Sequence, residues 1–180
     1  MAHLTVGVEY GIHCLLWMAS AEDKPLSTRE LAALQGISHS FLAKIFPKLE
    51  RAGIVRASEG VRGGYVLARE PGRINFLQIV DAIEGRKPLF DCQDIRGRCA
   101  LFGGEPPSWA MHGVCAIHAV MLQAEKAMRD TLTARTLADV GQTVMSKAPA
   151  DFSTEVQAWL GDRTRNHGRK PHTYEREVPS

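Results

Sequence analysis

The chain lacks the features that would direct it into a membrane or out of the cell. Its first residues, MAHLTVGVEY, contain no basic stretch, and Glu9 interrupts the apolar run, so we expect no secretory signal peptide. No apolar stretch reaches the length needed to cross a bilayer. We therefore predict a cytoplasmic protein, in a reducing compartment where clustered cysteines favour metal or redox roles over structural disulfides.

The sequence also lacks the common signatures of an enzyme. It has no phosphate-binding loop, no nucleophile elbow and no HExxH zinc motif. A catalytic site built from Glu9, His13 and a cysteine would need a substrate pocket, which no pattern in the sequence indicates. We predict that the protein is not an enzyme.

Net charge is low, at +2 over 180 residues, and does not by itself indicate a nucleic-acid partner. Its distribution is more informative, because residues 38–73 carry seven Lys or Arg against three Glu, a local charge of +4. The hydrophobic fraction of 44% is sufficient to bury a core. At this length we expect one ordinary domain, or a small domain with a dimerisation element and a tail.

The first half of the chain has the pattern of a helix-turn-helix. A first helix is predicted over residues 5–21, where apolar residues recur at helical spacing. A capping box at Ser27–Glu30 begins a short helix that Gly36 ends, and a second helix follows over residues 40–52. Two capped helices joined by a short turn of this kind form a helix-turn-helix.

The second helix of this pair is predicted to turn four apolar side chains toward the core: Phe41, Leu42, Ile45 and Leu49. Pro47 falls inside this helix, where a proline removes one backbone hydrogen bond and crowds the preceding turn, at a cost of about 3 kcal/mol. We therefore expect a kink at Pro47 or an early end to the helix.

Two short β-prone runs, at residues 54–57 and 65–68, flank the segment SEGVRGG and predict a hairpin with a basic tip. A helix-turn-helix followed by such a hairpin is a winged helix, so the fold class is mainly α with a small β-hairpin wing. Because residues 38–73 are basic, we favour DNA over protein as the partner. The predicted DNA contacts lie on the second helix and the wing: Ser38, His39, Ser40, Lys44, Lys48, Arg51, Arg62, Gly63 and Gly64.

A loop rich in proline and glycine follows a further capped helix, predicted over Asn75–Glu84. Three of the four cysteines lie in or beside this loop: Cys92, Cys99 and Cys115. A charged, glycine-rich loop offers little core in which to bury a thiol, so we favour a metal or cluster site over unrelated thiols. Cys14, on the first helix, is instead predicted to pack in the core.

After the loop, apolar residues recur every three or four positions: Val114, Ile117, Met121, Ala124 and Met128. We interpret this seam as a dimerisation helix, because operator binding favours two-fold dimers; the alternative is a helix packed on its own domain. The segment TLADVG, at residues 136–141, begins a short final helix.

The predicted organisation therefore has four parts. Residues 1–85 form the winged helix-turn-helix domain, and residues 86–113 form the cysteine loop. Residues 114–145 hold the dimerisation helix and the final helix. Residues 146–180 are an extension, which we expect to be disordered after residue 161 because it is polar there.

Four segments together resemble the Rrf2 family of bacterial winged-helix regulators. They are GVEYGIHC near the start, ISHSFLAKIFPKLERAGIV in the helix-turn-helix, EGVRGGYVL in the wing, and the cysteine loop that leads into the long helix. The resemblance covers about residues 1–145. It implies a homodimer with an iron–sulfur cluster near the dimer interface, whose state alters the affinity for DNA.

The resemblance leaves several ligand sets open. The commonest family pattern has three cysteines, here Cys92, Cys99 and Cys115, plus a variable fourth ligand, although the gap before Cys115 is long in this chain. The segment Cys115-Ala-Ile-His118 is similar to the Cys-x-x-His of some members, and this nominates His118.

Two further sets involve the first helix. Glu9 falls where some members have an acidic ligand from the partner chain. Glu9 and His13 together are similar to a Glu and His pair that other members use with two cysteines of the other subunit. We favour this last set, with Cys115 as one thiolate and either Cys92 or Cys99 as the other.

Two thiolates with an imidazole and a carboxylate suit a 2Fe–2S cluster, which we favour over a 4Fe–4S cluster. Zinc could use the same side chains, but the paired spacing of structural zinc sites is absent. The predicted function is a dimeric transcriptional regulator that binds DNA and senses redox state through the cluster. The alternatives are a nitric-oxide or iron–sulfur-supply sensor of the same fold, and a zinc-bound or cluster-free regulator.

Overall fold

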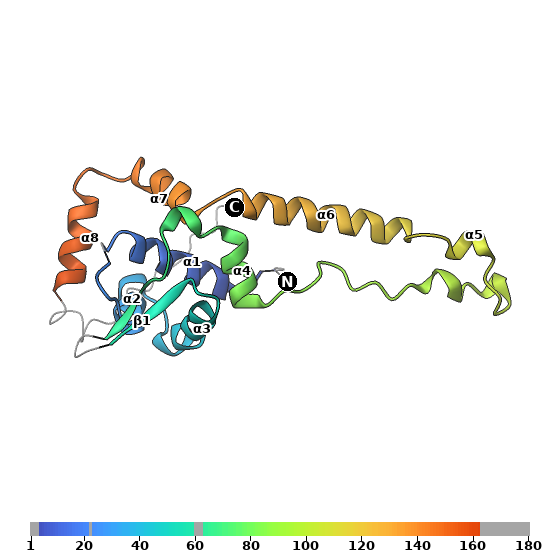
Figure 1. Ribbon diagram of the computed structural model, residues 1–180, viewed down its shortest axis with the longest axis horizontal. Helices are drawn as coiled ribbons and strands as arrows, with labels where there is room; N and C mark the ends of the chain where they lie inside the picture. The colour runs from blue at the N-terminus through green and yellow to red at the C-terminus, as the bar shows by residue number, and fades with distance from the viewer. Residues whose placement is uncertain (1–3, 22, 60–62, 163–180) are drawn as a thin grey trace, which may run out of the picture. The chain divides into compact units, whose positions relative to one another are not determined.

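The computed structural model describes residues 4–21, 23–59 and 63–162 (Figure 1). Contacts between residues divide the chain into two compact units, one formed by Met1–Gly85 with Thr133–Ser180 and the other by Arg86–Leu132. The first unit contains the helix-turn-helix, and the second contains the three loop cysteines. No helix in the described part of the chain is both long and apolar enough to cross a membrane.

Helix α1 (Val6–Ala19) is the central element of the first unit. Helices α3 (His39–Arg51), α4 (Phe76–Glu84) and α7 (Leu137–Met145) all pack on it (Figure 1). At its contact with α4, a Cβ atom added to Gly11 would lie only 2.5 Å from Cδ1 of Ile83. The missing side chain at Gly11 therefore allows a close approach between the two helices.

The helix-turn-helix forms as predicted from α2 (Thr28–Gln35) and α3. The capping box is present, since the Glu30 amide donates to Ser27 Oγ at 3.2 Å and the Ser27 amide donates to Glu30 Oε2 at 2.8 Å. Gly36 ends α2 in the left-handed conformation, with φ of 66°, which favours glycine.

Helix α3 continues through Pro47 to Arg51, so of the two expected outcomes the early end is wrong, while the kink stays a prediction. Proline leaves the carbonyl of Ala43 without its helical donor. Ala43 and Pro47 are both exposed, so water can satisfy that carbonyl without burying an unpaired group.

The inward face of α3 also differs from the prediction at one position. Phe41, expected in the core, is 37% exposed and packs edge-to-face on Tyr10, with 5.5 Å between ring centroids. Phe46 is fully buried instead and packs on Tyr65. The buried face follows the spacing Leu42, Ile45, Phe46 and Leu49, a continuous helical stripe that excludes Phe41.

The predicted wing is an antiparallel hairpin of β1 (Val55–Ser58) and β2 (Gly64–Leu67). A third segment joins it, because Leu26 and Tyr65 exchange backbone hydrogen bonds of 3.0 and 2.8 Å. A Cβ atom on Gly64 would lie 2.7 Å from the carbonyl carbon of Leu26. The base of the wing is therefore fixed tightly to the chain that leads into α2.

Helix α4 begins with the predicted capping box, in which the Gln78 amide donates to Asn75 Oδ1 at 2.9 Å. The short 3-10 helix η1 (Pro71–Arg73) precedes it. Backbone hydrogen bonds join the start of α4 to the start of α7, from Phe76 N to the Arg135 carbonyl at 3.0 Å and from Leu137 N to the Ile74 carbonyl at 2.8 Å. The final helix predicted from residue 136 is thus part of the first unit.

A last helix, α8 (Phe152–Gly161), was not predicted. Its start has no side-chain cap, so local sequence signals for it are weak. It is held by tertiary contacts, since Phe152 packs on Trp17 with 6.0 Å between ring centroids, and Val156 and Leu160 are buried. The segment expected to be disordered lies, beyond Asp162, outside the described residues.

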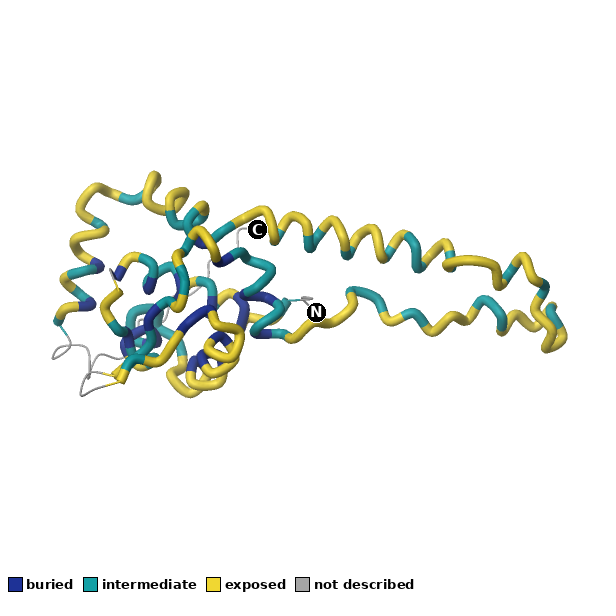
Figure 2. The backbone as a smooth tube through the Cα atoms, viewed as in Figure 1, coloured by how far each residue is buried: buried dark blue, intermediate teal, exposed yellow. Residues whose placement is uncertain are grey.

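The second unit consists of the long helix α6 (Ala116–Thr133) and the chain that precedes it. That chain is irregular, as predicted, with three short helical turns: η2 (Ile95–Arg98), η3 (Ala100–Phe102) and α5 (Ser108–Met111). Its first part lies along α6, because the Leu89 amide donates to Glu125 Oε2 at 3.0 Å. No residue of α6 is buried within this chain (Figure 2).

We predict that Gly64→Ala destabilises the protein, because the added methyl group would meet backbone atoms of Leu26 and Ser27 at 2.7–3.0 Å. The expected loss is about 1–3 kcal/mol in the free energy of unfolding, measured by urea denaturation. Gly72→Ala is the matched control, since nothing lies within 4 Å of its added methyl group. Its stability should be unchanged or slightly raised. Equal effects of the two substitutions would contradict the close contact at Gly64.

Candidate metal centre and nucleic-acid interface

Helix α1 presents two of the candidate ligands. Glu9 and His13 are both exposed and stand one helical turn apart, so their side chains project from the same side of the helix. Neither side chain has a hydrogen-bond or ion-pair partner among the described residues. The helix thus offers a carboxylate and an imidazole that are not engaged elsewhere in the described parts of this chain.

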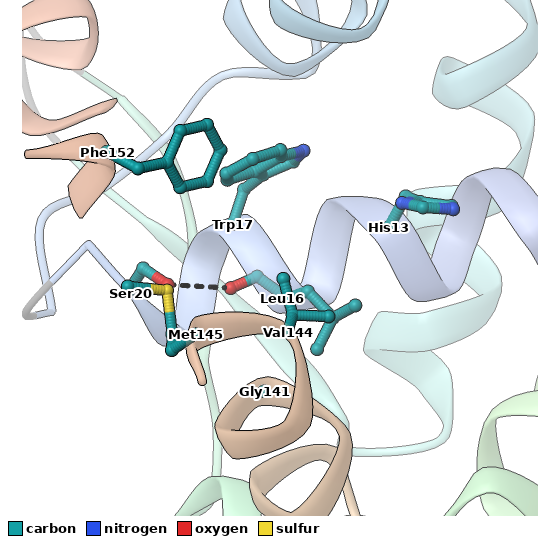
Figure 3. A pocket seen from close by; sticks show the side chains of 8 residues that line it. All are labelled: His13, Leu16, Trp17, Ser20, Gly141, Val144, Met145 and Phe152. Atoms are coloured by element: carbon teal, nitrogen blue, oxygen red, sulfur yellow. Dashed lines mark hydrogen bonds between the residues drawn. The ribbon is translucent and has the colours of Figure 1, made fainter. Parts of the chain in front are cut away.

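His13 also borders an apolar pocket of about 160 Å³. Figure 3 shows His13 at one end of the group of lining residues, one turn from Trp17, whose indole ring faces Phe152. The other lining residues come from α1, its C-cap and α7: Leu16, Ser20, Gly141, Val144 and Met145. The side of α1 that carries His13 therefore has an apolar environment, to which the unpredicted helix α8 contributes.

Cys14 follows His13 but is not available as a ligand. Its side chain is 0% exposed, and Gln35 Nε2 donates a hydrogen bond to its Sγ at 3.2 Å. Burial raises the pKa of the Cys14 thiol to about 12, although the hydrogen bond from Gln35 acts in the opposite direction. At neutral pH the thiol is protonated and packs as a small apolar side chain, as expected.

The three loop cysteines are free thiols in less buried positions. Cys99 is exposed between η2 and η3, and Cys92 and Cys115 are half-buried. Cys115 directly precedes α6, and its carbonyl accepts a hydrogen bond from the Ala119 amide at 2.8 Å. The backbone of Cys115 is therefore fixed by the first turn of that helix, whereas Cys99 lies in a short irregular turn.

His118 lies in the first turn of α6, three residues after Cys115. Its ring packs against Phe90 with 6.1 Å between centroids. Phe90 is two residues before Cys92, so this contact also holds the chain that leads to Cys92 against α6. The contact between Phe90 and His118 thus lies two residues from Cys92 in sequence.

The structure does not gather the candidate ligands into one complete site. No group of three or more His, Cys, Asp or Glu side chains placed to hold a metal occurs among residues 4–21, 23–59 and 63–162. The first unit carries Glu9 and His13, and the second unit carries Cys92, Cys99, Cys115 and His118. The donor types still fit a 2Fe–2S cluster, because thiolates, imidazole and carboxylate all bind iron.

Helix α3 exposes most of the residues predicted to contact DNA: Ser38, His39, Ser40, Lys44 and Arg51. Ser38 Oγ lies 2.8 Å from Ser40 Oγ, and His39 Nε2 lies 3.0 Å from Thr28 Oγ1. The contact with Thr28 holds the start of α3 to α2. No local pattern predicts this contact, because the two residues belong to different helices.

The remaining predicted DNA contacts have different surroundings. Lys48 is exposed as well, but its Nζ donates a hydrogen bond of 2.7 Å to the backbone carbonyl of Ile83. At the wing, Gly63 is exposed and Gly64 is half-buried. The predicted contact Arg62 lies outside the described residues.

A sequence model of the Rrf2 family, described as an iron-dependent transcriptional regulator, matches residues 4–143. The chain belongs to the Rrf2 family. It is 31% identical to protein rrf2 of Nitratidesulfovibrio vulgaris, over 76% of this chain and 85% of that protein. It is 28% identical to the transcriptional regulator NsrR of Halalkalibacterium halodurans, over 76% of this chain and 88% of that protein. The protein is thus a helix-turn-helix transcriptional regulator and not an enzyme.

Solved structures share the fold. T. potens IscR superposes with a TM-score of 0.62 at 21% identity, over 85% of this chain and 96% of that one. CymR, described as the global cysteine regulator of B. subtilis, superposes with a TM-score of 0.59 at 21% identity, over 79% of this chain and 98% of that one. The predicted fold, mainly helical with a β-hairpin wing, is confirmed.

We predict that, in the cluster-free protein, alkylating reagents modify the three loop cysteines much faster than they modify Cys14. With a pKa of about 12, Cys14 is a thiolate in only roughly one molecule in ten thousand at pH 8, and it is also inaccessible. N-ethylmaleimide should modify Cys92, Cys99 and Cys115 first, as measured by peptide mass spectrometry. All four thiols should react in denaturant. Labelling of Cys14 as fast as Cys99 in the folded protein would contradict its burial.

Proposed function

We propose that this Rrf2 regulator is a cytoplasmic homodimer that binds a DNA operator and senses redox state through a 2Fe–2S cluster. The ligands are Glu9 and His13 of one chain with Cys115 and either Cys92 or Cys99 of the other. The observation that carries the proposal is the exposed Glu9–His13 pair, which lacks any partner in the described part of its own chain. The iron-dependent description of the family supports iron as the metal.

The separation of the ligands supports a shared site. Glu9 and His13 supply two donors on α1, which is too few to hold a cluster alone. The thiols belong to a different unit of the chain. Ligands drawn from two chains complete a four-donor site without requiring all the donors to gather in one chain.

The surface of α6 supports the homodimer. No residue of this 18-residue helix is buried, and its residues Ile117 and Val120 are 65% and 61% exposed. Val114, the first residue of the predicted seam, lies two residues before the helix and is 63% exposed. An exposed apolar surface on a helix is typical of an interaction site, and a second copy of the same helix could bury it. A two-fold dimer also matches the symmetry of operators read by helix-turn-helix proteins.

Cys115 is the thiolate that we propose with the most support. Its backbone is bonded to the first turn of α6, next to the apolar seam. A ligand fixed on the dimerisation helix stays close to the two-fold axis, where donors from both chains can meet. A bound 2Fe–2S cluster would supply a one-electron redox couple, and the carboxylate and imidazole of α1 would set its charge and potential.

The DNA contacts that we propose lie on the exposed side of α3: Ser38, His39, Ser40, Lys44 and Arg51. The hydroxyl and imidazole groups lie at the N-terminus of α3, where backbone amides and the helix dipole also favour phosphate. Gly63 and the wing tip, with Arg62, are proposed to contact the DNA backbone beside the major groove.

A cluster-free regulator is the second candidate. It is favoured by the three loop thiols, which are free in this chain, with Cys99 exposed and Cys92 and Cys115 half-buried. CymR, which shares the fold, is described as a cysteine regulator. In that case the exposed thiols, not a cluster, would carry the response.

We predict that protein purified without oxygen is brown and contains iron and acid-labile sulfide in equal amounts. Glu9→Ala and Cys115→Ala should each lose most of the iron, because each removes one of only four ligands. Cys14→Ala is the matched control and should keep the cluster, since Cys14 is buried away from any ligand role. Visible absorption and iron analysis measure the result. A colourless protein with no iron would support the cluster-free candidate, and stoichiometric zinc would support a structural site.

Heterodimers test whether the ligands come from two chains. Glu9→Ala and Cys115→Ala chains, differently tagged and co-expressed, should form heterodimers in which one interface site keeps intact Glu9 and intact Cys115. The other site loses both residues. The isolated heterodimer should therefore recover about half of the wild-type iron. If both ligands act within one chain, each site keeps one defect, and the heterodimer would hold no more iron than either mutant homodimer.

A further inference from the structure

The last turn of α4 is a junction between three parts of the protein. Its carbonyl groups are among the four that a helix leaves without an internal donor. Lys48, on α3, supplies a donor to one of them, with 2.7 Å between its Nζ and the Ile83 carbonyl oxygen. A cation at this end of α4 also interacts favourably with the helix dipole. This contact fixes the ammonium of Lys48 on the helix that packs behind α3.

The same turn holds the start of α1. The carboxylate of Glu84 accepts hydrogen bonds from the Thr5 amide at 3.1 Å and from Thr5 Oγ1 at 2.5 Å. Thr5 is the N-cap of α1, and its side chain accepts a hydrogen bond from the Gly7 amide at 3.2 Å. Glu84 therefore anchors the first turn of the helix that carries Glu9.

Packing reinforces these hydrogen bonds. Ile83 is only 4% exposed, and its side chain fills the space that Gly11 leaves open on α1. Two adjacent residues, Ile83 and Glu84, thus touch both the ligand-bearing helix and the DNA-reading helix.

The chain leaves the first unit directly after this turn. Gly85 ends α4 with φ of 78°, and the second unit, with the loop cysteines, starts at Arg86. Gly85 is therefore the covalent link between the last turn of α4 and the start of the cysteine loop. The hydrogen bond from Lys48 joins the same turn to α3.

We propose that Lys48 is a positioning residue, which sets the place of α3 relative to the end of α4, and not a phosphate contact. The turn Ile83–Gly85 then acts as the relay through which the state of the cysteine loop reaches the DNA-reading helix. The relay rests on the proposed function, whereas the role of Lys48 in positioning α3 does not.

The salt dependence of operator binding separates the two roles. A lysine that neutralises a phosphate contributes about one unit to the slope of log affinity against log salt, whereas a positioning residue contributes none. We expect Lys48→Met to weaken operator binding by about three- to tenfold, because the Ile83 carbonyl loses its charged donor, with an unchanged salt slope. Lys48→Arg keeps a donor and should restore most of the affinity.

Lys44→Met is the matched control on the same helix. Lys44 is exposed, and no partner is found for it among the described residues. Its substitution should lower both the affinity and the salt slope, the latter by about one unit. These measurements use cluster-free protein on an operator fragment, by fluorescence anisotropy from 50 to 200 mM salt, so they do not depend on the cluster.

The relay is tested with the cluster-containing protein. In the wild type the ratio of operator affinities with and without the cluster measures the coupling, and in Lys48→Met this ratio should approach one. A salt slope reduced as much as in Lys44→Met would overturn the positioning role, as would unchanged affinity. A reduced affinity with the wild-type ratio would overturn the relay alone. If the wild type binds no cluster, both the proposed function and the relay are wrong. The salt slopes still decide whether Lys48 positions α3.

Circular dichroism checks that each variant is folded. If Lys48→Met is unfolded, Lys48→Gln takes its place with the same expectations.

Discussion

The close approach of α4 to α1 at Gly11 is the contact on which the rest of the first unit depends. It places Ile83 against the middle of α1 and leaves no room for a larger side chain at that position. A helix turns 100° per residue, so the face opposite Gly7 and Gly11 is the one that carries Glu9 and His13. Burying one face of α1 thereby exposes the other, and the packing of the core determines where the candidate ligands point.

The same contact explains why α4 can connect functions that lie far apart in sequence. Its first turn is bonded through backbone groups to the start of α7, and its last turn is bonded to α1 and α3. A helix of nine residues fixed at both ends is a rigid connector. When one end of such a helix is displaced, the other end moves with it, since packed helices shift as rigid units.

The elements of the DNA-binding unit could be predicted because their signals are local. Capping boxes at Ser27 and Asn75 and the terminating Gly36 act within three or four residues, so the sequence alone shows them. Two features that the sequence analysis did not predict depend on contacts between distant residues instead. Helix α8 has no side-chain cap and depends on Trp17, which is more than a hundred residues away. Phe41 and Phe46 are equally apolar, and only the packing of α3 against its neighbours selects the second for the core.

For the candidate DNA-binding surface, the sequence indicates which types of residue are present, but it does not predict which other residues they contact. Charge alone placed Lys48 on DNA, because a lysine one turn beyond Lys44 on a basic helix has the composition of a phosphate contact. A phosphate and a helix C-terminus both attract a cation, so the sequence cannot distinguish them. The contact with Ile83 brings together residues 35 positions apart, and no local pattern encodes it.

A site shared between two chains would also link three equilibria. A cluster that needs donors from both chains binds only the dimer, so it stabilises the dimer by mass action. Operator binding favours the dimer as well, and this alone would make the cluster increase DNA affinity at low protein concentration. A change in affinity between two states of the same intact dimer needs more, namely a different position of α3 in each state. We propose that such a difference reaches α3 along the short covalent path from the cysteine loop through Gly85 into α4, and from there through the contact of Lys48 with the Ile83 carbonyl.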